Sequence, residues 1–178
     1  MANALLFLLD AVLGFLTLSL LLRFYMQAFR VSFNNQIGAF VVQLTNWAVK
    51  PLRKVIPSAL GLDLSSLLPA FLMQAALVGA GLALHGAFEL YALDQLLLGI
   101  LWQALLGVLR VSLHLLVGAL LLLFILSWVN PHSPIAYPVR QLTDPFLNPV
   151  RRLLPPIAGI DLSPMVLLLL VQFLLMLL

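Results

Sequence analysis

The sequence predicts an all-α membrane protein in which four membrane helices form two parallel helix–loop–helix repeats, with amphipathic helices in the loops. Composition, four apolar stretches and an internal repeat support this fold class. Of the 178 residues, 63% are apolar and 8% are charged, whereas soluble domains have roughly 25% charged residues. Too few polar side chains are present to cover a water-soluble surface, so we expect most of the surface to face the lipid bilayer.

The candidate membrane spans are Ala4 to Phe29, Ser66 to about Tyr91, Leu96 to Val129, and Pro164 to Leu178. The first three are long enough to cross roughly 30 Å of hydrocarbon at about 1.5 Å per residue. The first has no cleavage site after it, so we expect it to be retained. The third would reach about 51 Å, so we expect it to begin as an interfacial helix and to enter the bilayer near Leu105. The fourth is short, at about 22 Å.

An internal repeat divides the chain into residues 1–92 and 93–178. Residues 43–74 align with residues 141–172 at a constant offset of 98, and twelve of these 32 pairs are identical. The identical pairs include Gly, Asp, Pro and Gln, which chance similarity between apolar stretches would not match. Two membrane helices in each unit return both loops to the same side, so we interpret the repeats as parallel.

Seven of the nine basic residues lie in the two loops. They are Arg30, Lys50, Arg53, Lys54, Arg140, Arg151 and Arg152. The positive-inside rule places both loops in the cytoplasm and both termini outside. The basic side chains then lie at the level of lipid headgroups, where each contributes about 1 kcal/mol of attraction. They serve either as plain topology determinants or as a surface that binds lipid or a partner.

Each loop also has local structure that the sequence predicts. From Ile37 to Val49 an apolar face is expected to lie on the membrane, through Phe40, Val41, Leu44 and Trp47. In the second loop, seven prolines between Pro131 and Pro156 are expected to prevent one continuous helix.

A Gly, apolar, Asp, Leu, Ser motif ends each loop, at Gly61 to Ser65 and Gly159 to Ser163. Ser163 followed by Pro164 fits an N-cap and the first residue of a helix, with Asp161 near the positive end of the helix dipole. Capping explains both aspartates, Asp63 and Asp161. The alternative is a paired site in which the two carboxylates bind a cation or a partner's basic group.

Ionisable residues inside the spans are candidates for function because they are costly in hydrocarbon. Arg23 is close enough to the cytoplasmic end to reach the interface. The others are expected to form a polar cluster at the outer mouth of the bundle, with Arg110 neutralised by an acid; they are Asp10, His85, Glu89, Arg110 and His114. This cluster would pin the helices together, conduct an ion or proton, or, through its histidines, hold haem or a metal.

Several function classes are excluded or disfavoured by residue content. The chain has no cysteine, so disulfides, thiol catalysis and cysteine-held cofactors are excluded within it. No nucleophile with its base, phosphate-binding glycine loop or paired-carboxylate site is present. The basic residues follow topology rather than nucleic-acid binding. We therefore expect no enzymatic activity, no metal and no nucleic-acid partner.

The stretch from Arg140 to Gln172 resembles the signature of the YggT/YlmG family of small bacterial and plastid membrane proteins. The matching positions are Thr143, Asp144, Pro145, Pro149, Arg151, Arg152, Pro155, Gly159, Asp161, Ser163 and Pro164. The first copy departs from it at Trp47, Ser58 and Ser66, so any role of the signature falls mainly on the second copy.

This resemblance implies a multipass protein of the bacterial cytoplasmic membrane with no established enzymatic activity. Relatives have been linked to osmotic-stress tolerance, to the neighbourhood of division genes and, in plastids, to haem assembly onto a cytochrome b subunit. Three hypotheses follow. The first is a non-enzymatic assembly or scaffold factor that engages lipid headgroups and a membrane-protein partner or a second copy of itself. The others are an ion-handling protein of osmotic adaptation and a haem-handling protein.

Overall fold

The computed structural model describes residues 2–56, 63–86, 92–130, 133–154 and 161–178. Over these residues the chain forms α-helices and no strand, which confirms the all-α prediction. The helices are α1 (Ala2–Ala28), α2 (Gln36–Leu52), α3 (Leu64–Leu84), α4 (Leu93–Val129), α5 (Ala136–Leu153) and α6 (Ser163–Leu177).

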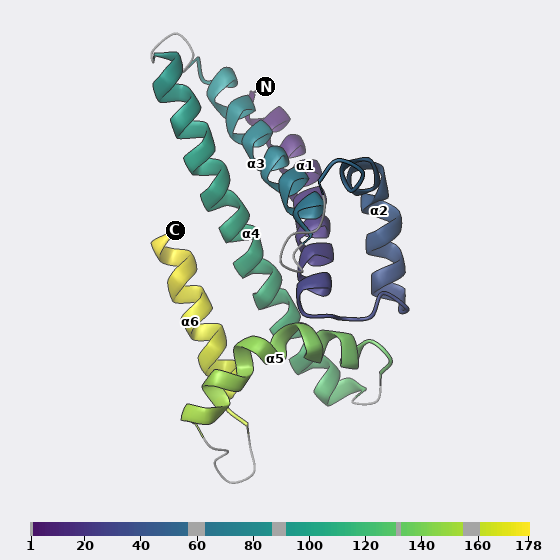
Figure 1. Cartoon of the computed structure of the whole chain (residues 1–178). Coiled ribbons are helices and arrows are strands. Elements are labelled where there is room, and N and C mark those ends of the chain that lie inside the picture. Colours follow the sequence, from purple (N-terminus) through teal and green to yellow (C-terminus); the bar gives the residue numbers. More distant parts are fainter. Residues whose placement is uncertain (1, 57–62, 87–91, 131–132, 155–160) are drawn as a thin grey trace.

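Three helices, α1, α3 and α4, have the length and apolar composition of membrane spans. They pack against one another, while α5 crosses one end of the bundle and α6 lies beside the second half of α4 (Figure 1). The apolar helix α6 has 15 residues. The chain therefore has the helices of a membrane protein, and the fourth span and the two-repeat arrangement stay predictions.

The expected division of the third apolar run near Leu105 is wrong. Helix α4 runs without a break through 37 residues, from Leu93 to Val129, which is about 55 Å at 1.5 Å per residue. Between these bounds there is no proline, and each glycine is tolerated inside a helix at about 1 kcal/mol. The sequence therefore contains no residue that would end the helix near Leu105.

Two apolar cores hold the helices, and a smaller cluster joins them. Leu20, Leu21, Val49 and Ala70 bring together α1, α2 and α3. A second core draws on α4, α5 and α6, through Leu116, Leu120, Leu147, Val150, Leu167 and Val171. Between them, Met26 and Val31 pack against Leu142 of α5. This cluster fixes α5 beneath the end of α1.

A buried polar contact fixes the middle of the bundle. The Gln74 amide of α3 donates to the Thr17 hydroxyl of α1 at 3.2 Å, and both side chains are buried. Gly107 of α4 faces this contact so closely that a Cβ there would lie 2.4 Å from the Gln74 side-chain oxygen. The missing side chain at Gly107 therefore lets α4 approach α3, as small residues commonly do between apolar helices.

The second loop is not one continuous helix, as its prolines predict, although helix α5 covers residues 136–153. Helix α5 contains Pro145 and Pro149, and both side chains are exposed. The carbonyl groups that lose their helical donors thus lie on the outer face, where water can bind them. In the first loop, Val41 is buried whereas Phe40 and Trp47 are exposed, so only part of the predicted apolar face of α2 is free to contact lipid.

Candidate functional site

Arg151, near the end of α5, binds two aspartates. Its Nε donates to Asp161 at 2.9 Å, and its Nη1 donates to Asp144 at 3.1 Å. Asp144 lies two turns earlier on α5, while Asp161 precedes α6. The guanidinium thereby ties α5 to the beginning of α6. Both carboxylates remain 42% exposed.

The charges of this group stabilise one another. Burial by itself would raise the pKa of Asp161, but hydrogen bonds from Ser163 and Arg151, together with the positive charge of Arg151, outweigh it and lower the pKa below its ordinary value. Burial likewise opposes ionisation of Arg151, and the bonds to Asp161 and Asp144 raise the pKa of Arg151 above its ordinary value. The group therefore stays ionised at neutral pH.

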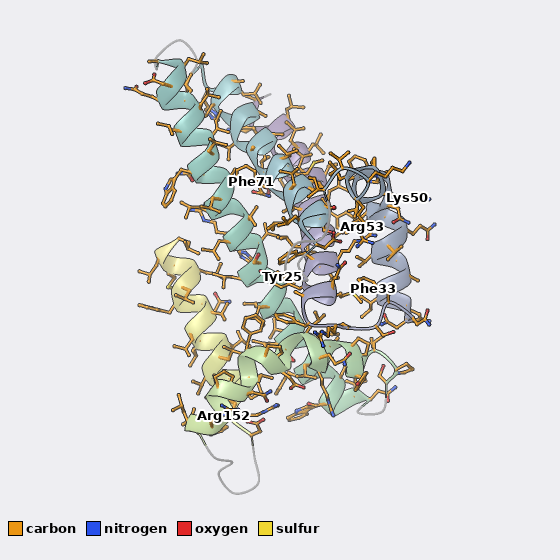
Figure 2. The ribbon with its side chains drawn as sticks, viewed as in Figure 1. Tyr25, Phe33, Lys50, Arg53, Phe71 and Arg152 are labelled. Carbon is orange, nitrogen blue, oxygen red and sulfur yellow. The ribbon has the colours of Figure 1, made fainter. Side chains whose placement is uncertain are left out.

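The same ion pair occurs 98 positions earlier, where the carboxylate is buried although the arginine stays 45% exposed. Arg53 donates to Asp63 at 2.5 Å and to the amide oxygen of Gln27 at 2.8 Å. The Asp63 side chain is 2% exposed and also accepts a hydrogen bond from Ser66. Figure 2 shows Arg53 between α1 and α2. The first pair thus joins α1, α2 and α3, and its carboxylate is buried among them.

The capping interpretation of the two aspartates needs correction. Asp63 is the N-cap residue of α3, yet it makes no side-chain cap bond and instead pairs with Arg53. Asp161 does accept from the backbone N–H of Ser163 at 3.0 Å, but the N-cap residue is Leu162 and Ser163 is already helical. A two-aspartate cation site does not form, because each carboxylate is bound to the arginine of its own loop.

A groove of about 540 Å³ opens beside Arg151, between the last turns of α4, α5 and the start of α6. Its polar lining consists of Arg140, Asp144, Arg151, Asp161 and Ser127. Its apolar lining comes mainly from α4, through Leu120, Leu123, Phe124 and Trp128, with Pro164 of α6. Four signature positions of the sequence therefore meet at one concave surface.

The remaining predicted loop residues lie around these two pairs. Lys54, Arg140 and Arg152 are exposed, and within the described part of the chain none of the three forms an ion pair. Figure 2 places Arg152 at the end of α5 that lies farthest from α2. Thr143 is buried and donates to the backbone of α5. Pro155 and Gly159 lie outside the described residues.

Arg23 does not reach the interface, contrary to the prediction. Arg23 is 4% exposed, and its Nη1 donates to the Thr45 hydroxyl at 2.8 Å and to the Asn46 amide oxygen at 3.1 Å. Helix α2 supplies these acceptors, so the buried guanidinium fixes α2 against α1. The sequence contained this signal only as an arginine in α1 and a Thr-Asn pair in a segment that packs beside it.

The polar cluster predicted at the outer mouth does not assemble from the described residues. Arg110 donates to the carbonyl oxygen of Leu178 rather than to Asp10, and it lies 17 positions along α4, about 26 Å from its start.

His85 is the C-cap residue of α3, at the end of the bundle where α4 begins (Figure 1). His114 and His85 each bond only a carbonyl in their own helix, and the described residues contain no group of three or more metal-ligating side chains. Glu89 lies outside the described residues.

Fold and site together define a small helical protein of membrane-like composition with a charged groove at one end. A protein-family model described as CCB3/YggT matches residues 2–83 and 102–178. The YggT protein of Escherichia coli (strain K12) is 42% identical over 170 residues, covering 94% of this chain and 85% of that protein. A Vibrio alginolyticus protein named for the proC 3'region is 35% identical over 174 residues, covering 96% and 91%.

The chain belongs to the CCB3/YggT family. This confirms the resemblance drawn from the signature between Arg140 and Gln172. No solved structure matches the chain.

Proposed function

We propose that the protein is a non-enzymatic assembly or scaffold factor of the bacterial cytoplasmic membrane. Its two loops face the cytoplasm, and their basic surface engages lipid headgroups and a membrane-protein partner. This partner surface consists of Arg53, Lys54, Arg140, Arg151 and Arg152. The positive-inside rule supports this orientation, because seven of nine basic residues lie in the two loops.

The observation that carries this proposal is the contrast between the two Arg–Asp pairs. In the pair of Arg53 and Asp63 the carboxylate is 2% exposed, so only the arginine, at 45%, is accessible to another molecule. The pair of Arg151 and Asp161 leaves its carboxylate 42% exposed, and it lies beside Arg140 and Arg152, which are also exposed. Charged side chains that are already positioned by the fold, and are not covered by it, suit recognition of another molecule.

Electrostatics set the size of the expected effect. Each basic residue near an anionic surface contributes about 1 kcal/mol. Replacing Arg140 and Arg152 with glutamine would therefore remove about 2 kcal/mol, or roughly a thirtyfold change in an equilibrium constant. Neither side chain holds the described helices together through an ion pair, so the double variant should insert and fold.

The test is photocrosslinking in native membranes from position 153. Leu153 is 82% exposed and adjoins Arg152. We expect the wild-type background to capture a protein partner reproducibly. The R140Q/R152Q double variant should capture much less of the same partner. The matched control is Lys50→Gln, on the outer side of α2 in Figure 2, which should leave capture unchanged. Capture of lipid alone, or of the chain itself alone, would contradict the assembly role.

A further inference from the structure

The groove beside Arg151 presents balanced charge. Arg140 and Arg151 carry two positive charges, and Asp144 and Asp161 carry two negative charges. An anion-binding site would be expected to have a surplus of cationic groups without carboxylates among them. The four side chains together suit a ligand that carries both signs of charge.

The groove also has a polarity gradient along α4. Leu120, Leu123 and Phe124 line its apolar end, and Ser127 and Trp128 follow about a turn later on the same helix. The whole series covers about 12 Å of helix axis. Tryptophan is typical of the level of lipid headgroups, whereas leucine and phenylalanine suit the acyl chains. The groove therefore changes from apolar to polar as a phospholipid does.

Hydrogen-bonding capacity remains on both kinds of charged group. Within the described residues Arg140 donates to no side chain, and Arg151 uses only Nε and Nη1. Asp144 accepts one bond, at Oδ1. A carboxylate can accept about four bonds and a guanidinium can donate five. A phosphate at Arg140 and an ammonium group at Asp144 would both find free partners.

The first loop lacks these features at the positions offset by 98. Val42 stands at the position of Arg140, and Asn46 at the position of Asp144. Asp63, which corresponds to Asp161, is buried beneath its neighbours. The charge pattern of the groove thus belongs to the second loop, and it does not arise from the shared packing of both loops.

We infer that this groove binds a phospholipid whose headgroup carries a phosphate and a primary ammonium group, as in phosphatidylethanolamine. Arg140 and Nη2 of Arg151 hold the phosphate, and Asp144 and Asp161 accept hydrogen bonds from the ammonium. The acyl chains next to the headgroup contact Leu120, Leu123 and Phe124. A trimethylated choline headgroup cannot donate these hydrogen bonds. A purely anionic headgroup would face two carboxylates. The inference rests on the proposed function, since it names a ligand for part of the same surface.

The test is native mass spectrometry of the full-length protein, purified and exposed to equal amounts of three lipids with identical acyl chains: phosphatidylethanolamine, phosphatidylcholine and phosphatidylglycerol. We expect phosphatidylethanolamine to be retained roughly tenfold better than either competitor, because only its ammonium group is both a cation and a hydrogen-bond donor to the carboxylates. Equal retention of all three, or preference for phosphatidylglycerol, would overturn the inference. Retention of none of the three lipids would also overturn the inference.

Variants assign the effect to the groove. Asp144→Asn should weaken the preference for ethanolamine over choline, because only Asp161 then remains to accept from the ammonium. The substitution is compatible with the fold because asparagine occupies the corresponding position 46. Arg140→Gln should reduce retention of all three lipids. Asp94→Asn, which removes the same charge at the far end of α4, should change nothing. An unaltered ethanolamine preference in D144N would refute the site. Crosslinking from position 153 detects a protein partner independently, so the two proposals fail separately.

Discussion

The guanidinium of Arg53 lies 2.5 Å from the carboxylate of Asp63, and that carboxylate is 2% exposed. The corresponding contact between Arg151 and Asp161 measures 2.9 Å and leaves the carboxylate 42% exposed. The same pair thus occurs once with a buried carboxylate and once with an exposed carboxylate, while the two arginines are about equally exposed. Because burial decides what an ion pair contributes, the two settings should respond differently to the same substitution.

Asp63→Asn should lower the free energy of unfolding by about 1–3 kcal/mol, because the buried side chain loses the charge-assisted hydrogen bonds that it accepts from Arg53 and Ser66. Asp161→Asn should cost less than about 1 kcal/mol, since water screens the exposed pair. Thermal unfolding of both variants in the same detergent gives the comparison. Equal losses of stability would show that the exposure of the two carboxylates does not govern their contributions.

Gly107→Ala should destabilise the bundle by about 1–2 kcal/mol. The added Cβ would meet the Gln74 side chain at 2.4 Å, and moving that side chain would break its buried hydrogen bond to Thr17. Gly99→Ala, on the same helix, meets nothing within 4 Å and should be neutral or stabilising by up to about 1 kcal/mol. Unfolding midpoints in detergent distinguish the two. A neutral G107A would mean that α3 and α4 have room to separate.

Acid should remove the contribution of Asp161. The pKa of this carboxyl is lower in the folded protein than in the unfolded chain, so its stabilising effect is complete above the unfolded value of about 4 and disappears as pH falls through the folded value. The difference in thermal midpoint between wild type and D161N should therefore be constant from pH 5 to 7 and shrink below about pH 4. A difference that grows on acidification would reverse the sign of this linkage.

Asp10→Asn should not lower stability by more than about 0.5 kcal/mol, because no contact of the described residues is lost and a charge that is costly in hydrocarbon is removed. The carboxylate is exposed and no described residue forms an ion pair with it. The same unfolding assay measures this. A loss above about 2 kcal/mol would indicate that Asp10 has the buried basic partner that the polar-cluster hypothesis required.

Much of the helical architecture could be predicted because composition and apolar periodicity are local properties. The start of α6 near Pro164 and the amphipathic character of α2 follow from residues that lie close together in the sequence. The constant offset of 98 also indicated which arginines and aspartates were comparable. The family resemblance followed from the spacing of Pro149, Arg151, Gly159 and Asp161.

The pairing of charges could not be predicted because it depends on which helices touch. Arg23 is buried only because α2 brings Thr45 and Asn46 to it. Asp63 differs from Asp161 in exposure although the two motifs are nearly identical, since Gln27 and Ser66 close the first site. Bilayer thickness predicts a division of the third apolar run, whereas α4 continues because it contains no residue that ends a helix.

The continuous helix α4 connects the two apolar cores of the molecule. Its first half packs with α3, and its last turns line the groove with Trp128. A single helix of about 55 Å thus contributes to both apolar cores, through Val108 and Val111 in the first and through Leu116 and Leu120 in the second. The two halves of the chain share this element, so we expect them to unfold in one transition.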